Sequence, residues 1–441
     1  MYDEQSLSSY MKISKKLNSE NFDKQIKIAI LSSFTLNGLP ESIRVKLSTS
    51  NIFSHVFLGG YNQYNEEIIN KNSELYSFSP DICFLFLDAR KQLGELYFDP
   101  YSIDVQSRKK FINNKFEELI TLIEHFLQNS NSKLILNNLF IPTYSSYGIL
   151  EKKIDYGLQE MIMDFNKKVS DYFRNNSSVY VYDFNSFVSR IGENQIFDYR
   201  QYFFGDVQIS LRYIPHLSND LLGYIKSILG INKKCIVLDL DNTLWGGIIG
   251  EDGISGIKLG PIEPIGKAFV EFQKYLLALH NRGIILAINS KNNLDDVMEV
   301  FQNHPNMILK EEHFASLKIN WNDKVSNLKE ISQEINIGLD SMVFFDDDPV
   351  NRDFVRTLLP EILTVELSDD PSLYISKLIE LNEFNVLKIT NEDKQRGKMY
   401  QQQRKRIELK DDLNNFHDYL KKLNVKIHVK EANEFSIPRI S

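Results

Sequence analysis

Short apolar runs and longer amphipathic stretches alternate along most of this 441-residue chain, and the alternation occurs in two separate series. Apolar runs of this length between helical patterns are typical of buried parallel strands joined by crossover helices. The first series predicts strands at 26–31, 55–60, 81–88, 133–138 and 179–184, and the second at 234–241, 283–289, 306–310, 341–347 and 361–367. The sequence therefore predicts an α/β protein with two doubly wound parallel-sheet domains in series.

The domain boundaries are predicted from the places where the alternation pauses. A closing helix at about 218–229 and a short linker at 230–234 separate the first domain, residues 1–231, from the second, residues 232–375. From about Thr390 the composition shifts to a charged helical stretch, which is followed by the strand-like run VKIHVKEA. Residues 376–441 are therefore predicted to be a C-terminal helical segment that opens a further, truncated domain.

Composition excludes several classes of protein. A net charge of −8 argues against a general binder of nucleic acid or of anionic membranes. No apolar run reaches the roughly 18 residues of a membrane span, and the N-terminus lacks the layout of a signal peptide. The two cysteines, Cys83 and Cys235, lie in apolar runs, which indicates buried reduced thiols. We therefore expect a cytoplasmic protein with neither nucleic-acid nor membrane partners.

The segment DLDNTLWGG follows the first strand of the second domain and carries the first candidate site. Side chains alternate along a strand, so Asp239 and Asp241 share a face, and their mutual repulsion favours a cation such as Mg²⁺ between them. Asp239 is then placed to attack phosphorus, and Asp241 to protonate the leaving oxygen and activate water. We expect Thr243 to hold the Asp241 carboxylate, and Asn242 and Thr243 to lie on the phosphate-binding side. The alternative is an acidic strand end that merely caps a loop.

Two further segments supply cationic or donor groups. Ser290 in INSKNN is predicted to end a strand and to be the N-cap of a helix, where free amides favour phosphate. Lys324 in NWNDK precedes a predicted helix, and its ammonium could bridge the attacking carboxylate and the phosphoryl group. Taken singly, the serine could be a simple cap and the lysine a solvated surface charge.

The fourth segment is FFDDDPVNR, in which Asp346 and Asp347 emerge from a buried strand. There they could complete a metal shell, although three successive acids could instead form an exposed turn before Pro349. Ligands of open α/β sheets bind beyond the carboxyl ends of strands, and all four segments fall at such ends. Their joint occurrence in this order predicts one phosphate- and metal-binding site.

The four segments resemble the motif series of the haloacid dehalogenase (HAD) superfamily, and in detail its FkbH-like branch, also called the HAD type IIIC phosphatases. This resemblance covers most of the chain, including the N-terminal domain that begins IAILSSFT. It implies a nucleophile and an acid/base, phosphate ligands, a Mg²⁺ cofactor and, within 376–441, the start of a truncated acetyltransferase-like domain. The implied nucleophile and acid/base are Asp239 and Asp241, the phosphate ligands include Ser290 and Lys324, and the metal residues are Asp239, Asp241, Asp346 and Asp347. The chain departs from the family's usual DDNP and Glu-Arg at Asp348 and Asn351, which bears on substrate.

Spacing between the motifs predicts access to the site. HAD enzymes that close on small molecules usually insert a cap domain after the first or second motif. Here residues 247–290 hold only a hairpin-like flap, with Asp252-Gly253 as its tight turn, and one helix. We therefore expect a HAD Rossmann-like domain without a large cap, open to a large or protein-borne substrate, unless the N-terminal domain serves as the lid.

The N-terminal domain resembles the SGNH hydrolases weakly. The candidate residues are Ser32 or Ser33, Asn137 or Asn138, a backbone donor at Gly59 or Gly60, and the histidine His216. The usual aspartate three residues before that histidine is replaced by Tyr213. We therefore favour an α/β platform that binds a substrate or partner over a second active hydrolase.

Three functions remain for the whole chain. The first is hydrolysis of a phosphorylated small molecule or of a substrate bound to a carrier protein. The second, implied by relatives in polyketide pathways, is glyceryl transfer from a bisphosphoglycerate-type donor to an acyl carrier protein. Cys235 is an unsuitable internal relay for that transfer, because it lies four residues before Asp239, roughly 13 Å along a strand at about 3.3 Å per residue. The third is a non-enzymatic scaffold, against which the complete set of chemical residues argues.

Overall fold

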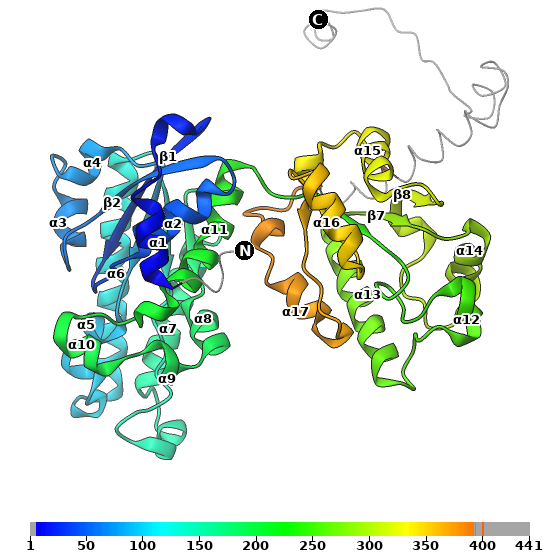
Figure 1. Cartoon of the computed structure of the whole chain (residues 1–441). Coiled ribbons are helices and arrows are strands. Elements are labelled where there is room, and N and C mark those ends of the chain that lie inside the picture. Colours follow the sequence, from blue (N-terminus) through cyan, green and yellow to red (C-terminus); the bar gives the residue numbers. More distant parts are fainter. Residues whose placement is uncertain (1–5, 392, 394–398, 401–441) are drawn as a thin grey trace, which may run out of the picture. The chain divides into compact units, whose positions relative to one another are not determined.

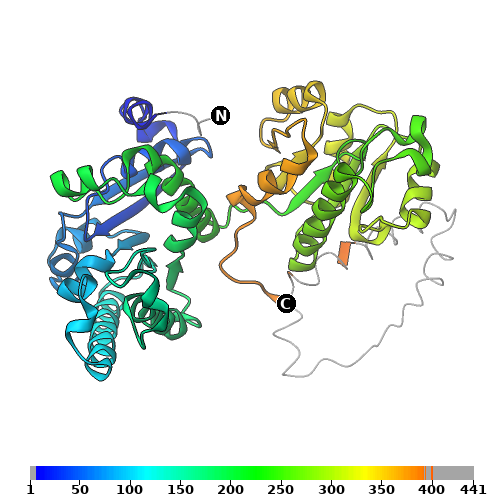
Figure 2. The ribbon, with the colours of Figure 1, turned by 90° about the horizontal axis from the view of Figure 1, so that it is seen from below.

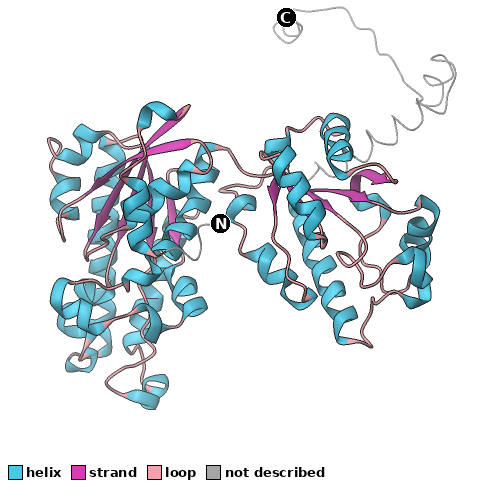
Figure 3. Ribbon diagram, in the orientation of Figure 1, coloured by secondary structure: helices cyan, strands magenta, loops and turns pink. Residues whose placement is uncertain are grey.

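The computed structural model describes residues 6–391, 393, 399 and 400. The chain divides into two compact units, Met1–Ile225 and Lys226–Ser441, with the boundary inside helix α11 (Ile214–Leu229). Each unit has one five-stranded sheet with helices packed around it (Figures 1 and 3). The predicted α/β class with two parallel sheets is therefore confirmed. The charged helix and the strand-like run predicted beyond Thr390 lie outside the described residues, apart from 391, 393, 399 and 400.

In the first unit the sheet has the strand order β2-β1-β3-β4-β5, and all neighbouring strands are parallel. All five predicted strands are present, each shifted by a few residues at most. Strand β1 lies between β2 and β3, so chain order reverses at β1, which is where an open α/β sheet forms a crevice. The strands are β1 (Lys24–Ser32), β2 (Ile52–Leu58), β3 (Ile82–Phe86), β4 (Lys133–Asn137) and β5 (Val179–Tyr182).

Helices cover the first sheet on two sides (Figure 2). The long helix α6 (Val105–Asn129) begins where Asp104 accepts hydrogen bonds from two free backbone amides of its first turn. Its apolar stripe packs with that of α7 (Leu158–Phe173) into one hydrophobic core. The remaining helices are α1 (Leu7–Ser14), α2 (Leu39–Ser48), α3 (Tyr64–Ile69), α4 (Glu74–Phe78), α5 (Ala89–Leu93), α8 (Phe184–Ile191), α9 (Glu193–Ile196) and α10 (Tyr199–Gly205).

The second sheet has the order β10-β9-β6-β7-β8, again entirely parallel. Strand β6 is central and fully buried, and β7 and β9 lie on either side of it. The carboxyl ends of these three strands therefore meet at the switch point of the sheet. The strands are β6 (Cys235–Leu238), β7 (Ile285–Ser290), β8 (Phe314–Ile319), β9 (Met342–Phe345) and β10 (Leu363–Thr364).

One predicted strand of the second domain was wrong. Residues 306–310 form no strand, and the edge strand β8 comes a few residues later. Met307 and Leu309 are buried as an apolar run should be. The backbone amides of Ile308 and Leu309, however, donate to the side-chain Oε1 of Gln273, at 3.0 and 3.1 Å. A buried glutamine thus replaces the ladder partner, because buried amides require an acceptor of some kind.

The flap after Asp241 also differs from the predicted hairpin. Gly246 and Lys258 pair in an antiparallel bridge at its base, but the tip is the short helix α12 (Ile249–Gly256). Asp252 lies inside this helix and accepts a hydrogen bond from the backbone amide of Ile248 at 2.8 Å, so it does not form the predicted tight turn. Gly253 kinks α12 with a φ of 64°. A kinked helical tip therefore takes the place of the hairpin turn.

The other helices of this unit are α13 (Pro264–Arg282), α14 (Leu294–Asn303), α15 (Lys324–Glu334), α16 (Pro349–Leu358) and α17 (Tyr374–Ile379). Among the described residues of both units, no helix combines the length and apolarity needed to cross a bilayer. Cys83 and Cys235 are free and fully buried, as predicted, and burial raises the pKa of both thiols.

Candidate active site

The switch point of the second sheet brings the four predicted segments together. Asp239 directly follows the central strand β6, and its backbone amide donates to the carbonyl of Phe345 on β9 at 2.9 Å. Ser290 is the last residue of β7, and Asp346 directly follows β9. Lys324 is the first residue of α15, the helix after β8. Parallel strands end at one edge of their sheet, so residues far apart in sequence meet there.

Lys324 is the central cation of the site. Its Nζ lies 2.7 Å from Oδ1 of Asp239 and 3.1 Å from Oδ2 of Asp346. Its side chain is only 2% exposed, so the solvated surface charge considered as the alternative is wrong. Burial by itself would lower the pKa of Lys324, but the two carboxylates outweigh burial and raise this pKa above its ordinary value. Lys324 therefore remains an ammonium that faces two carboxylates.

Three carboxylates form a cluster at this edge. One oxygen each of Asp239, Asp346 and Asp347 lies within 4.8 Å of the others. Burial, followed by repulsion from Asp239, raises the pKa of Asp346. Burial and the charges of Asp239 and Asp346 raise the pKa of Asp347 to about 7. The ammonium of Lys324 balances only part of the negative charge of these three carboxylates. A hard cation that prefers oxygen ligands would balance the rest.

Asp241 is held apart from this cluster. Its Oδ1 accepts hydrogen bonds from the indole Nε1 of Trp245 at 2.9 Å and from the backbone amide of Ile249 at 3.2 Å. Its Oδ2 accepts one from Nδ2 of Asn292 at 3.0 Å. Burial raises the pKa of Asp241 and these donors oppose the rise. The carboxylate is thus fixed by the flap and by the loop after β7, and it is not among the three clustered groups.

The loop after β7 differs from the prediction. The N-cap of α14 is Asn293. The prediction that Ser290 caps this helix is therefore wrong. The intervening Asn292 is 5% exposed, and its Nδ2 donates to Ser290 Oγ at 3.1 Å as well as to Asp241. The two residues after Ser290 therefore form a turn that aims Asn292 into the site, and the helix starts only after it.

Asn242 and Thr243 have structural contacts. Asn242 adopts a left-handed φ of 52°, and its Oδ1 accepts from the backbone amide of Gly247 at 2.9 Å, which shapes the start of the flap. Thr243 is fully buried, and its Oγ1 has no hydrogen-bond partner among the described residues. The expected bond from Thr243 to Asp241 is therefore absent, and Trp245 and Asn292 hold that carboxylate instead.

Three buried residues that support the site were missed by sequence reasoning. Asn289 is fully buried and donates to the carbonyl of Lys324 at 2.9 Å, while its own carbonyl accepts from the Lys324 ammonium at 2.6 Å. Asn327 donates to Oδ1 of Asn289 at 3.0 Å. Arg352 donates to the carbonyls of Asp346 and Asp347, at 2.8 and 2.6 Å. The only signal for them was their place beside the motifs, inside otherwise apolar surroundings.

In the first unit, the candidate serines have structural partners. Ser32 Oγ accepts from the Phe34 amide at 3.0 Å, and Ser33 Oγ accepts from the Asp88 amide at 2.8 Å. The amide of Gly59, considered as an oxyanion donor, donates to the carbonyl of Ile30 at 2.9 Å. These contacts favour the platform over a second hydrolase.

The other SGNH candidates are likewise placed by the fold. Asn137 joins β4 to the end of β3 through bonds to the amide and carbonyl of Leu87, at 2.7 and 3.0 Å. Asn138 donates to Asp183 at 2.8 Å. His216 is exposed on α11, and its ring centroid lies 5.6 Å from that of Tyr213. Since β3 is the strand beside β1, the acidic residue at its end, Asp88, lies nearer the switch point than either asparagine.

Together these features define a two-domain α/β protein with a lysine-bridged carboxylate site at the switch point of its second sheet. Residues 27–226 match the family model described as FkbH, N-terminal domain. The resemblance to the FkbH-like branch inferred from the motifs is therefore confirmed. Comparison with curated proteins gives no match.

Among solved structures, the chain is similar to the N-terminal part of the protein BF1531 from Bacteroides fragilis, described as containing a phosphatase domain and complexed with Mg. The two share 29% identity with a TM-score of 0.79, and the match covers 87% of this chain and 99% of that one. A lipase, Lip_vut3, from a goat rumen metagenome is 14% identical, with a TM-score of 0.34 and coverage of 45% of this chain and 96% of its own. Because the BF1531 match covers 87% of this chain, it includes both units.

Proposed function

We propose that this protein is a magnesium-dependent phosphohydrolase or phosphotransferase of the HAD type that acts through an aspartyl-phosphate on Asp239. The observation that carries the proposal is the position of Lys324, whose ammonium contacts both Asp239 and Asp346. A carboxylate is a poor nucleophile toward an anionic phosphoryl group unless positive charge offsets the repulsion. A buried ammonium aimed at the attacking oxygen provides such charge in a preorganised form. The similarity to a Mg-complexed phosphatase domain supports the same function.

The residues present fit a divalent cation. Asp239, Asp346 and Asp347 offer oxygen ligands within 4.8 Å of one another. Burial and the neighbouring carboxylate charges raise the pKa values of Asp346 and Asp347, and a cation bound there would offset those charges. Arg352 fixes the backbone of both acidic residues after β9. When bound there, Mg²⁺ would screen the negative charge of the phosphoryl group.

In this proposal the chain's own residues perform the proton and group transfers. An Asp239 oxygen forms a bond to phosphorus as the bond to the leaving oxygen breaks, and Asp241 gives that oxygen a proton. Asp241 then accepts a proton from water, whose oxygen attacks the phosphorus and releases inorganic phosphate and free Asp239. Trp245, the Ile249 amide and Asn292 hold Asp241 in place for both steps. Ser290, Lys324, Asn242 and Thr243 remain the proposed phosphate-side residues.

The alternative is glyceryl transfer from a bisphosphoglycerate-type donor to an acyl carrier protein. Cys235 is fully buried at the start of β6, whereas Asp239 lies beyond its end, and burial raises the pKa of the thiol. An internal thiol relay is therefore disfavoured, and transfer would have to use the carrier's own thiol. We propose hydrolysis of a phosphorylated small molecule or carrier-bound substrate as the primary activity.

The test is phosphate release from a panel that includes p-nitrophenyl phosphate and bisphosphoglycerate, with Mg²⁺ or with EDTA. Wild type should turn over only with Mg²⁺, and Asp239→Asn should lose at least about 1,000-fold in kcat. The matched control is Asp348→Asn. Asp348 belongs to the same acidic run but caps α16 through the amide of Val350, a task that asparagine also performs.

Two results would overturn the proposal. One is turnover that persists in EDTA or in Asp239→Asn. The other is a folded wild type that binds Mg²⁺ but hydrolyses no ester on the panel, which would favour carrier-protein loading or a scaffold.

A further inference from the structure

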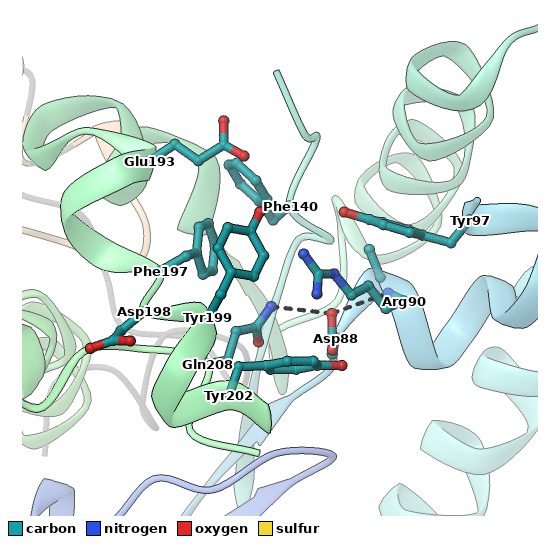
Figure 4. Close-up of a pocket in the computed structure, with 11 residues that line it drawn as sticks. Asp88, Arg90, Tyr97, Phe140, Glu193, Phe197, Asp198, Tyr199, Tyr202 and Gln208 are labelled. Atoms are coloured by element: carbon teal, nitrogen blue, oxygen red, sulfur yellow. Dashed lines mark hydrogen bonds between the residues drawn. The ribbon is translucent and has the colours of Figure 1, made fainter. Parts of the chain in front are cut away.

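The pocket at the end of β3 in the first unit is small (Figure 4). Asp88, Arg90 and Gln208 are among its lining residues, and it holds about 20 Å³, which is room for a single water. Such a water would donate to the two acceptors of its wall that have no partner among the described residues, Oδ2 of Asp88 and Oε1 of Gln208. A larger contact surface for an organic ligand lies beside the candidate active site of the second unit, where apolar side chains are exposed.

The chain has two tryptophans, and both make a hydrogen bond within the loops of the candidate active site. Trp245 is fully buried and holds Asp241. Trp321 precedes Lys324 by three residues, and its indole Nε1 donates to Oδ1 of Asn293 at 3.2 Å. Trp321 is nevertheless 71% exposed. A large apolar ring that a hydrogen bond orients and that faces water is a ready contact surface for a ligand.

Hydrogen bonds tie the loop of Trp321 to the side of the site where Asp241 lies. Asn293, the partner of the indole, directly follows Asn292, whose Nδ2 donates to Oδ2 of Asp241 at 3.0 Å. The amide of Asn320 donates to the carbonyl of the last residue of β7 at 3.1 Å. In the proposed reaction Asp241 protonates the leaving oxygen, so the group attached to that oxygen lies beside the loops that hold this carboxylate.

Two more exposed apolar side chains belong to these loops. Ile248 is 41% exposed and precedes Ile249, whose amide donates to Asp241. Leu294 is 50% exposed and is the first residue of α14, directly after the cap that accepts from Trp321. A single exposed isoleucine or leucine is ordinary on a protein surface. Here three exposed apolar side chains come from three separate loops that hydrogen bonds connect to one carboxylate, so a group next to that carboxylate meets apolar surface.

We infer that the leaving group of the substrate is flat and apolar and that it stacks on the indole of Trp321. This inference rests on the proposed phosphatase function and names its substrate class, the phosphate monoesters of aryl or arylalkyl alcohols. The ammonium of Lys324 attracts the phosphoryl group, whereas the leaving group gains free energy by moving from water onto an aromatic face. Trp321 is therefore a specificity-determining residue, and Ile248 and Leu294 border the same contact.

Kinetics with two matched esters test this inference. 2-Phenylethyl phosphate and ethyl phosphate release primary alcohols of similar acidity, so the two esters differ in the phenyl ring and little in reactivity. With Mg²⁺, the full chain should show a kcat/KM about tenfold higher for 2-phenylethyl phosphate. Trp321→Ala should reduce this preference to below about threefold, and Trp321→Phe, which keeps an aromatic face, should retain at least about half of it.

The control is Leu358→Ala, at a half-exposed residue that ends α16, and it should leave the preference unchanged. Thermal unfolding checks that each variant is folded. Equal kcat/KM values for the two esters in the wild type would overturn the inference. A preference that Trp321→Ala leaves unchanged would do the same.

Binding of analogues that cannot be hydrolysed separates this inference from the proposed function. If neither ester is turned over, the phosphatase function fails, and 3-phenylpropylphosphonate and propylphosphonate still decide the inference. In calorimetric titrations with Mg²⁺, the phenyl analogue should bind about tenfold more tightly. It should also move the tryptophan emission to shorter wavelength, and Trp321→Phe should abolish this shift because the remaining tryptophan, Trp245, is buried. Equal affinities, binding of neither phosphonate, or a shift that persists in Trp321→Phe would refute the contact.

Discussion

The ammonium of Lys324 lies 2.7 Å from Oδ1 of Asp239, although 85 residues separate them in the sequence. This ion pair is almost completely buried and also includes Asp346, which is fully buried. Both partners lie at the carboxyl edge of one parallel sheet, so the topology, and not local sequence, creates the contact. Removing either partner leaves charge buried without compensation, a situation far more costly than the loss of a surface ion pair.

Lys324→Ala should therefore destabilise the second unit by about 3–5 kcal/mol, since Asp239 and Asp346 then repel each other without an ammonium between them. Mg²⁺ should recover part of this loss. Urea unfolding with and without Mg²⁺ measures both effects. The control, Lys291→Ala, removes an exposed lysine next to Ser290 and should change stability by less than about 0.5 kcal/mol. A loss below 1 kcal/mol for Lys324→Ala would contradict the buried pair.

Asn292→Ala should slow turnover because Asn292 joins Ser290 to Asp241 and so positions the proposed acid/base. We expect kcat for p-nitrophenyl phosphate to fall about 10- to 100-fold, with KM changed less than about threefold. The phosphorylated enzyme should also accumulate, because the same carboxylate activates water. Quenched-flow measurement of the phosphoenzyme checks this. Asn293→Ala, at the adjacent N-cap that makes no side-chain capping bond, is the control. If Asn292 had a purely structural role, the substitution would slow the formation and the hydrolysis of the phosphoenzyme equally, and the phosphoenzyme would not accumulate.

Gln273→Leu should destabilise the second unit by roughly 3 kcal/mol, although leucine is apolar and of similar size. Gln273 is fully buried, and its amide donates to the carbonyl of Leu244 at 2.8 Å while accepting from the amides of Ile308 and Leu309. The substitution leaves these three backbone groups without partners. Denaturant unfolding of Gln273→Leu is the test, and Gln302→Leu, at an exposed position of α14, is the control. Equal free energies of unfolding for the two variants would disprove the role of Gln273.

Asp88→Asn should stabilise the protein at neutral pH. Burial raises the pKa of Asp88, and Asp206 adds to the rise, whereas the bond from the Arg90 amide and the charges of Arg90 and Lys91 oppose it. A raised folded-state pKa means that the wild type loses stability as pH rises from the ordinary carboxyl pKa through the folded value. Asparagine avoids this loss and still caps α5.

The difference in stability between Asp88→Asn and wild type should therefore be near zero at about pH 4 and should widen in favour of the variant as the pH rises to 7. Thermal unfolding at both pH values measures it. A gap that is constant with pH would mean that ionisation of Asp88 is not the cause.

Much of the fold follows from the sequence alone. The spacing and length of the apolar runs predicted nine of the ten strands that the structure shows. This was possible because a strand buried on both faces has a continuous apolar sequence. The same patterns placed Asp239, Ser290, Asp346 and Lys324 at strand ends or just after them. The prediction of a strand at 306–310 was wrong. The backbone amides of this buried run donate to a glutamine side chain of another helix, and an apolar pattern indicates burial but not the hydrogen-bond partner.

Tertiary structure decided what these residues contact. The strand order placed β6 between β7 and β9, so carboxylates and a lysine far apart in sequence became neighbours and changed one another's pKa values. The same cause made Asn292, and not Thr243, the partner of Asp241. Local sequence determines which segments become strands and helices and where chemical groups lie along them. Distances, burial and electrostatic coupling between these groups arise only when the sheets assemble, because each depends on residues that no local pattern brings together.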